Sequence, residues 1–122
     1  PDKRYYEYYG DIYYKRGTYS KAIEYYNEAV DKFGVSELKR KIAHCYVIKG
    51  DTERAYELLI SDRTQFLIEI SELFILVGLP KKALKFAQEA VEYYNDPNMV
   101  MRAYAALGGS YYSQKNYSKA YF

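Results

Sequence analysis

The chain has 122 residues, of which 49% are apolar and 28% charged, and its net charge is +2 at pH 7. This length supports one continuous core but is short for several domains. The 18 basic and 16 acidic residues are scattered, so no polybasic stripe points to nucleic acid and we expect no such partner. No apolar run reaches the roughly 18 residues that span a membrane, and no charged-then-apolar leader is present, so we expect no membrane partner.

The first element expected is a helix whose aromatic and small side chains stand three, four and seven positions apart and therefore share one face. These residues are Tyr6, Tyr9, Gly10 and Tyr13. A second helix repeats the alternation of small and large residues at Ala22, Tyr26 and Ala29. The small residues let the neighbouring helix approach and the rings fill the space around them, so the two faces are expected to interlock.

Two fainter copies of this arrangement follow along the chain. Each keeps an apolar residue, an aromatic, a glycine and an alanine in order, as in Ile42, Tyr46, Gly50 and Ala55, and in Ile70, Phe74, Gly78 and Ala83. We expect the glycines at 17, 50 and 78 to end the first helix of each pair in the left-handed conformation. Pro80 and Pro97 are expected near helix starts, where a missing amide hydrogen is harmless.

A helix over 64–77 is apolar around most of its circumference, with Gln65, Glu69 and Glu72 as a narrow polar stripe. Such a helix is expected to make contacts on more than one side.

The end of the chain repeats its beginning at a displacement of 98 positions. The matching residues of the late copy are Arg102, Tyr104, Gly108, Tyr111, Tyr112, Tyr117, Ser118, Lys119 and Ala120, against Arg4, Tyr6, Gly10, Tyr13, Tyr14, Tyr19, Ser20, Lys21 and Ala22. This displacement is close to three times a period of about 33–34 residues, which is typical of helical-hairpin repeats. The repetition therefore predicts an all-α solenoid.

These strings resemble the tetratricopeptide repeat (TPR) family, in which one helix carries aromatic-x-x-Leu-Gly-x-x-Tyr and the next carries Ala-x-x-x-aromatic-x-x-Ala. The resemblance implies an all-α, right-handed superhelical solenoid of antiparallel helix hairpins, with about three and a half TPR-like repeats in a single domain, 1–122. The repeats are expected at approximately 3–35, 36–62, 63–96 and, truncated, 97–122. The middle repeats depart from the pattern: Ala43 and Ser71 replace the small glycine, and Leu59 and Ala87 replace the later aromatic. Because the chain opens on Pro1 and stops a few residues into the second helix of the fourth repeat, we expect it to be a fragment of a longer protein.

Catalytic chemistry finds little support in the residues present. The single histidine and single cysteine are the neighbours His44 and Cys45, and neighbours on a helix point about 100° apart, so they are poorly placed to share a metal or to act as nucleophile and base. Cys45 is expected to be a small core residue, and one cysteine favours a reducing compartment, the cytoplasm or nucleus. The Gly108-Gly109 pair falls inside a predicted helix and is no phosphate loop. We expect no enzyme activity, cofactor or metal.

The resemblance implies a concave groove lined by the first helix of each repeat. The expected partner-binding residues are Arg4, Glu7, Asp11, Tyr14, Lys15, Arg40, His44, Val47, Ile48, Ile68, Glu72, Ile75, Leu76, Arg102 and Tyr112. The apolar members would form a strip that takes a partner's peptide segment or helix. Capture of a C-terminal carboxylate is a mode known in the family, and its matching positions here are Glu7, Asp11, Lys41, Gln65 and Glu69. Three acids and one glutamine stand where donors are needed, so we do not expect this mode.

The expected function is therefore that of a non-catalytic protein–protein interaction module, an adaptor in a multiprotein complex. The alternative is a self-association scaffold, such as a homodimer, formed through the apolar third repeat and the uncovered end of the solenoid.

Overall fold

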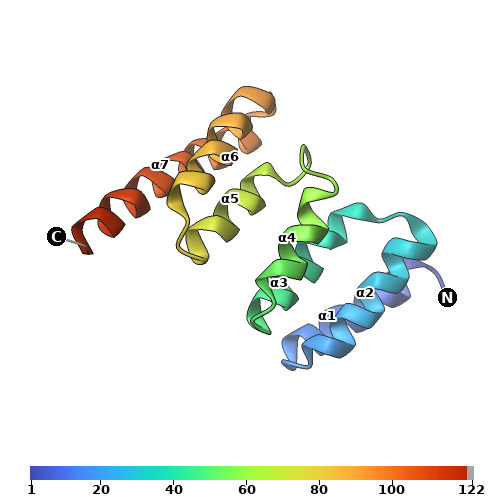
Figure 1. The fold of residues 1–122 in the computed structure, drawn as a ribbon. Helices are drawn as coiled ribbons and strands as arrows, with labels where there is room; N and C mark the ends of the chain where they lie inside the picture. Colours follow the sequence, from blue (N-terminus) through green and yellow to red (C-terminus); the bar gives the residue numbers. More distant parts are fainter. Residues whose placement is uncertain (121–122) are drawn as a thin grey trace. The chain divides into compact units, whose positions relative to one another are not determined.

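The computed structural model describes the backbone of residues 1–120 and the side chains of residues 1–115. Its helices pack as sequential antiparallel pairs (Figure 1), and this confirms the all-α prediction. In chain order they are α1 (Lys3–Lys15), α2 (Tyr19–Phe33), the short 3-10 helix η1 (Ser36–Leu38), α3 (Lys39–Ile48), α4 (Thr52–Ile60), α5 (Leu67–Leu76), α6 (Pro80–Tyr93) and α7 (Pro97–Ala120). The chain divides into two compact units, Pro1–Leu59 and Ile60–Phe122. Within the described part, no helix combines the length and the apolar character needed to cross a membrane.

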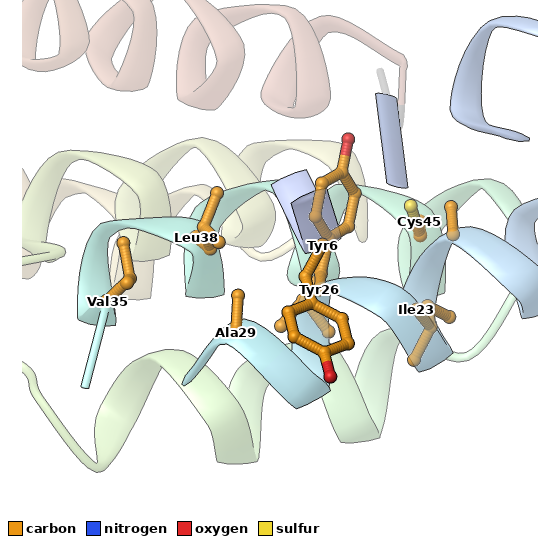
Figure 2. Packing of buried hydrophobic residues seen from close by; sticks show 9 residues of the cluster. Tyr6, Ile23, Tyr26, Ala29, Val35, Leu38 and Cys45 are labelled. Carbon is orange, nitrogen blue, oxygen red and sulfur yellow. The ribbon is translucent and has the colours of Figure 1, made fainter. Parts of the chain in front are cut away.

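The first unit is built around a close approach of α1 and α2. Tyr26 of α2 is fully buried, and its ring lies over Gly10 of α1, where an added Cβ would come within 2.5 Å of Tyr26 Cε1. Ala22 and Ala29, one turn to either side of Tyr26, are also fully buried. Figure 2 shows Tyr26 and Ala29 beside Tyr6 of α1 in this core. The expected interlocking of small and large residues on the two helices is confirmed.

Helix α3 completes the core of this unit. Ile42 and Cys45 of α3, together with Leu38 of η1, are buried in the same cluster as Tyr6 and Tyr26. Cys45 has no exposed surface, which confirms its prediction as a small core residue (Figure 2).

The helix ends follow the glycines and prolines. Gly17, Gly50 and Gly78 have φ values of 79°, 85° and 81°, so each adopts the left-handed conformation predicted for the end of the first helix of its pair. Helices α6 and α7 begin at Pro80 and Pro97, as expected. The turn expected between the two helices of the fourth repeat is not formed. The residue that corresponds to Gly17 at a displacement of 98 is Lys115, and α7 continues through it to Ala120. A residue with a Cβ disfavours the left-handed conformation, so the expected second helix of the fourth repeat is absent from the described backbone.

Helix α5 begins at Leu67, later than the expected residue 64. The preceding residues form tight turns, in which the Gln65 amide donates to the Asp62 carbonyl at 3.0 Å. Tyr94, at the end of α6, fixes this start because its hydroxyl donates to the Thr64 carbonyl at 2.8 Å and accepts from the Leu67 amide at 3.3 Å. A tyrosine that is distant in sequence therefore sets the boundary that the local apolar pattern placed too early.

The second unit packs α5, α6 and α7 through small residues. The Ser71 hydroxyl of α5 donates to the Ala83 carbonyl of α6 at 2.8 Å, and its oxygen lies 3.4 Å from that of Ser110 on α7. Both serines are fully buried. A further cluster, which also includes Leu67 and Ile68 of α5, buries the short side chains of Ala87, Ala90, Ala103 and Ala106. These short side chains let α5 and α7 approach each other and place their remaining faces along one groove.

We expect Gly10→Ala to destabilise the protein by about 1–3 kcal/mol, because the new methyl group would overlap the buried Tyr26 ring. Helix propensity acts in the opposite direction, since alanine exceeds glycine by about 1 kcal/mol. The matched control is Gly108→Ala, at the same place in the repeated pattern on α7, where an added Cβ meets nothing within 4 Å. The free energy of unfolding of this control should rise by roughly 0.5–1 kcal/mol. Urea denaturation followed by far-UV circular dichroism measures both changes, and an equal response of the two glycines would contradict the packing described.

Candidate protein-binding groove

A groove of about 470 Å³ runs between α5 and α7 in the second unit. Two seams of side chains face each other across it, with spacings of three and four residues along each helix. The lining residues are Ile68, Glu72, Ile75 and Leu76 from α5, and Arg102, Ala105, Ala106 and Gly109 from α7. All but Ala105, Ala106 and Gly109 belong to the set of binding residues predicted from the sequence, and the structure brings these predicted residues together.

The floor and the α5 wall of this groove are apolar and graded in exposure. Ile68 is buried at the bottom, Ile75 is half-buried, and Leu76 is 64% exposed at the rim. On the opposite wall, a Cβ added to Gly109 would lie 3.7 Å from Ile75 Cδ1, an ordinary contact distance. The α7 wall therefore has little side-chain bulk at this point, and a ligand can approach its backbone closely.

An ion pair between α5 and α7 lies at one end of the groove. Arg102 Nη2 lies 3.2 Å from Glu69 Oε2, and the Glu69 side chain is only 11% exposed. Arg102 also directs Nη1 towards Met99 Sδ at 3.6 Å, and its side chain is 43% exposed. The guanidinium is thus held in position by the protein while part of it faces solvent.

In the first unit, two predicted binding residues of α1, Asp11 and Tyr14, each contact α3. The Asp11 carboxylate accepts hydrogen bonds from the Tyr26 hydroxyl and from Lys41 Nζ of α3, the latter at 3.1 Å. The Tyr14 ring lies 5.8 Å from the His44 ring. Burial by itself raises the pKa of Asp11, but hydrogen bonds from Tyr26 and Lys41 and the charges of Lys41 and Lys15 lower it below its ordinary value.

The other predicted binding residues are mostly on the surface. Arg4, Lys15, Arg40, His44 and Ile48 are exposed, and Glu7 and Val47 are half-buried. In the second unit, Tyr112 is 69% exposed on α7 but does not line the groove.

Sequence reasoning missed two features of this site. Ala106 lines the groove through its small size, and alanine in a helix gives no sequence signal for this role. The Glu69–Arg102 pair had a signal, because its members are 33 positions apart, which is one helical-hairpin period. Opposite charges at this spacing on successive first helices are a sign of such contacts.

The two side chains that are chemically most reactive by type, those of His44 and Cys45, lie in different environments. Cys45 is buried while its neighbour His44 is exposed. Burial raises the pKa of the Cys45 thiol to about 11, so this thiol stays protonated near neutral pH. A protonated thiol is a poor nucleophile and a poor metal ligand. Among the residues with described side chains, no three or more His, Cys, Asp or Glu form a group that could hold a metal ion.

Because the partners of Asp11 stabilise its charged form, we expect Lys41→Met to raise the pKa of this carboxyl towards its ordinary value. The stability contributed by a carboxyl with a lowered pKa is present above its unfolded-state pKa and is lost as pH falls through the folded-state pKa. The acid-induced loss of stability should therefore be smaller in Lys41→Met. Carboxyl-detected NMR titration measures the pKa directly. Lys81→Met, in the other unit, is the control, and an Asp11 pKa unchanged by Lys41→Met would contradict the assigned cause.

No protein-family model matches the chain, and a comparison with curated proteins finds no match either. Inferences about function therefore rest on the residues and the geometry described above.

Proposed function

We propose that this chain is a TPR-like interaction module, a right-handed solenoid of helix hairpins, that binds a segment of a partner protein without catalysis. The observation that carries this proposal is the groove between α5 and α7, which has an apolar floor and a charged end. The volume of about 470 Å³ is within the range of sites that bury most of a small ligand. As an adaptor in a multiprotein complex, the module would work in the cytoplasm or nucleus.

The dimensions of the groove favour a short stretch of peptide. From Ile68 to Leu76 the α5 wall covers nine residues, and the eight steps between them rise by about 12 Å. About four residues of extended chain cover the same distance. We therefore expect a ligand with two or three apolar side chains, which pack on Ile68, Ile75 and Leu76 while its backbone approaches Gly109.

The charged residues favour one orientation of this ligand in the groove. Arg102 stands at one end, where the partly exposed guanidinium is fixed by Glu69, whereas Glu72 places an acidic group on the α5 wall. Fixed charges of opposite sign at different points of a groove select one orientation and register more than they add affinity. An acidic residue next to the apolar ones in the ligand would satisfy Arg102.

The proposal is tested with a random peptide library displayed on phage and selected on the immobilised chain. Selected peptides should share at least two apolar residues, and fluorescence anisotropy then gives their affinities. Gly109→Leu should weaken binding by at least about tenfold, because the new side chain fills the groove beside Ile75. Ile75→Arg should have a similar effect.

The matched control is Gly108→Leu, one position along the same helix and about 100° away from the groove. This variant should bind the selected peptides as the wild type does. A library that yields no groove-binding peptide, or peptides that bind equally to Gly109→Leu, would contradict the proposed function.

Self-association is the second candidate function, and exposed apolar side chains at the α5–α6 turn favour it. Leu76, Val77 and Leu79 are 64%, 39% and 43% exposed and lie within four positions of one another. A cluster of this kind on a protein surface often marks an interface.

Under this second hypothesis, the mass measured by light scattering should rise towards that of a dimer with increasing concentration. Leu79→Lys should keep the protein monomeric, whereas Tyr93→Lys, which changes an exposed residue of α6, should not. A wild-type protein that stays monomeric at all concentrations would rule the hypothesis out.

A further inference from the structure

The turn between α5 and α6 brings exposed apolar side chains together with exposed lysines. It lies at one end of this helix pair (Figure 1). The apolar side chains come from the end of α5 and from the turn, and the lysines come from the first half of α6. We call this set the basic tip, and its members are Leu76, Val77, Leu79, Lys81, Lys82 and Lys85.

The lysines of the basic tip have no acidic partners. No acidic residue stands between Glu72 and Glu89 in the sequence, although the whole chain carries a net charge of only +2. Glu89, one turn after Lys85, forms its ion pair with Arg63 at 2.7 Å. Among the side chains that the structure describes, no ion pair involves a lysine of the basic tip. Their positive charges therefore face solvent uncompensated.

The stability of α6 does not account for these lysines. The N-terminus of a helix carries a partial positive charge, so cations in the first turns oppose the helix dipole. Lys81 and Lys85 are also four positions apart, a spacing at which like charges repel each other on one side of a helix. Helix α6 has no acidic residue in its first turn and no basic residue in its last turn. An arrangement that the helix disfavours on both counts points to a ligand outside the fold.

An aromatic pair supports the basic tip from below. The Nζ atom of Lys82 lies 5.7 Å from the centre of the Phe74 ring, and this ring stacks on Phe86 with centroids 5.5 Å apart. Both rings are half-buried. A lysine stem that lies along an apolar surface keeps its ammonium group at the polar boundary, so the charge is held close to the exposed apolar side chains of the turn.

From these observations we infer that the basic tip attaches the protein to the anionic surface of a lipid bilayer. The apolar side chains enter the boundary between headgroups and acyl chains, while the lysines meet the lipid phosphates and carboxylates. The expectation of no membrane partner rested on the lack of a spanning run, and attachment to one leaflet needs no such run. The inference is independent of the proposed peptide groove, with which the basic tip shares only Leu76.

The charges and the position of the turn favour a bilayer over two other occupants. In a symmetric pair of chains each copy would present the same patch, so the lysines of both copies would meet and repel. An acidic protein would satisfy the lysines, but protein partners match each other in shape at the centre of an interface. Val77 and Leu79 belong to a turn and do not line the groove, and a deformable lipid surface accepts such a turn without a matching hollow.

The first test measures flotation of the full chain with lipid vesicles. Vesicles of phosphatidylcholine with about one third phosphatidylserine should bind the protein, and vesicles of phosphatidylcholine alone should not. Added salt should weaken the binding, because it screens the lysines. Lys81→Gln/Lys85→Gln should bind at least about tenfold more weakly, since each lysine near an anionic surface contributes about a factor of five.

The matched control is Lys15→Gln/Arg16→Gln, which removes the same charge from the α1–α2 turn. No large apolar side chain is exposed at this turn, so the double variant should bind vesicles as the wild type does. Both double variants should keep the far-UV circular dichroism of the wild type.

The second test follows the apolar part of the basic tip. The chain contains no tryptophan, so Leu79→Trp introduces a single fluorescent reporter at the turn. Its emission should shift to shorter wavelength on vesicles with phosphatidylserine, because the indole ring moves from water into the interface. Tyr93→Trp places the same reporter at the other end of α6, and its emission should not shift.

Several results would overturn the inference. One is the absence of binding to vesicles with phosphatidylserine, and another is an equal loss of binding in the two double variants, which would make net charge the cause. A Leu79→Trp shift produced by polyglutamate but not by vesicles would assign the basic tip to an acidic protein. A dimer that Leu79→Lys dissociates, formed by a chain that does not bind vesicles, would assign it to a second copy.

Discussion

The structure depends on the close approach of paired helices at one small residue. In the α1–α2 pair, Gly10 is that residue, because the fully buried Tyr26 ring leaves no room for a Cβ there. Ser71 has the same place on α5, where its hydroxyl also bonds the Ala83 carbonyl of α6. Close approach maximises the dispersion contacts between the two backbones, so these positions determine which faces of each helix are used up by packing and which remain for other purposes.

The groove in the second unit is a consequence of this packing. Because α6 and α7 meet through alanines and α5 meets α7 through Ser71 and Ser110, the side chains of Ile75 and Leu76 stay partly exposed in the space between α5 and α7. Ile68, at the bottom of this space, belongs to the core. The Glu69–Arg102 pair then links the two walls at one end. Exposed apolar side chains of α5 therefore lie beside a charged group that the fold holds in place.

Features that depend on local chemistry could be predicted from the sequence, and those that depend on distant partners could not. The left-handed glycines and the proline helix starts follow from backbone geometry, and the shared face of Tyr6 and Gly10 follows from helical periodicity. The start of α5 was placed too early because Tyr94, from the far end of α6, caps it. Most of the groove residues of α5 and α7 were predicted from the repeat, but the pairing of Arg102 with Glu69 depends on which residues of the two helices face each other.

The two adjacent glycines of α7 show how the same residue type can have different causes. Gly10 is required within the fold, whereas an added Cβ is tolerated sterically at both Gly108 and Gly109. Two such glycines cost a helix roughly 2 kcal/mol relative to alanine, and no contact in the described fold offsets this cost. Since neighbouring residues point about 100° apart, the pair removes side-chain bulk from two sides of α7, from the groove wall at Gly109 and from the side on which Gly108 lies.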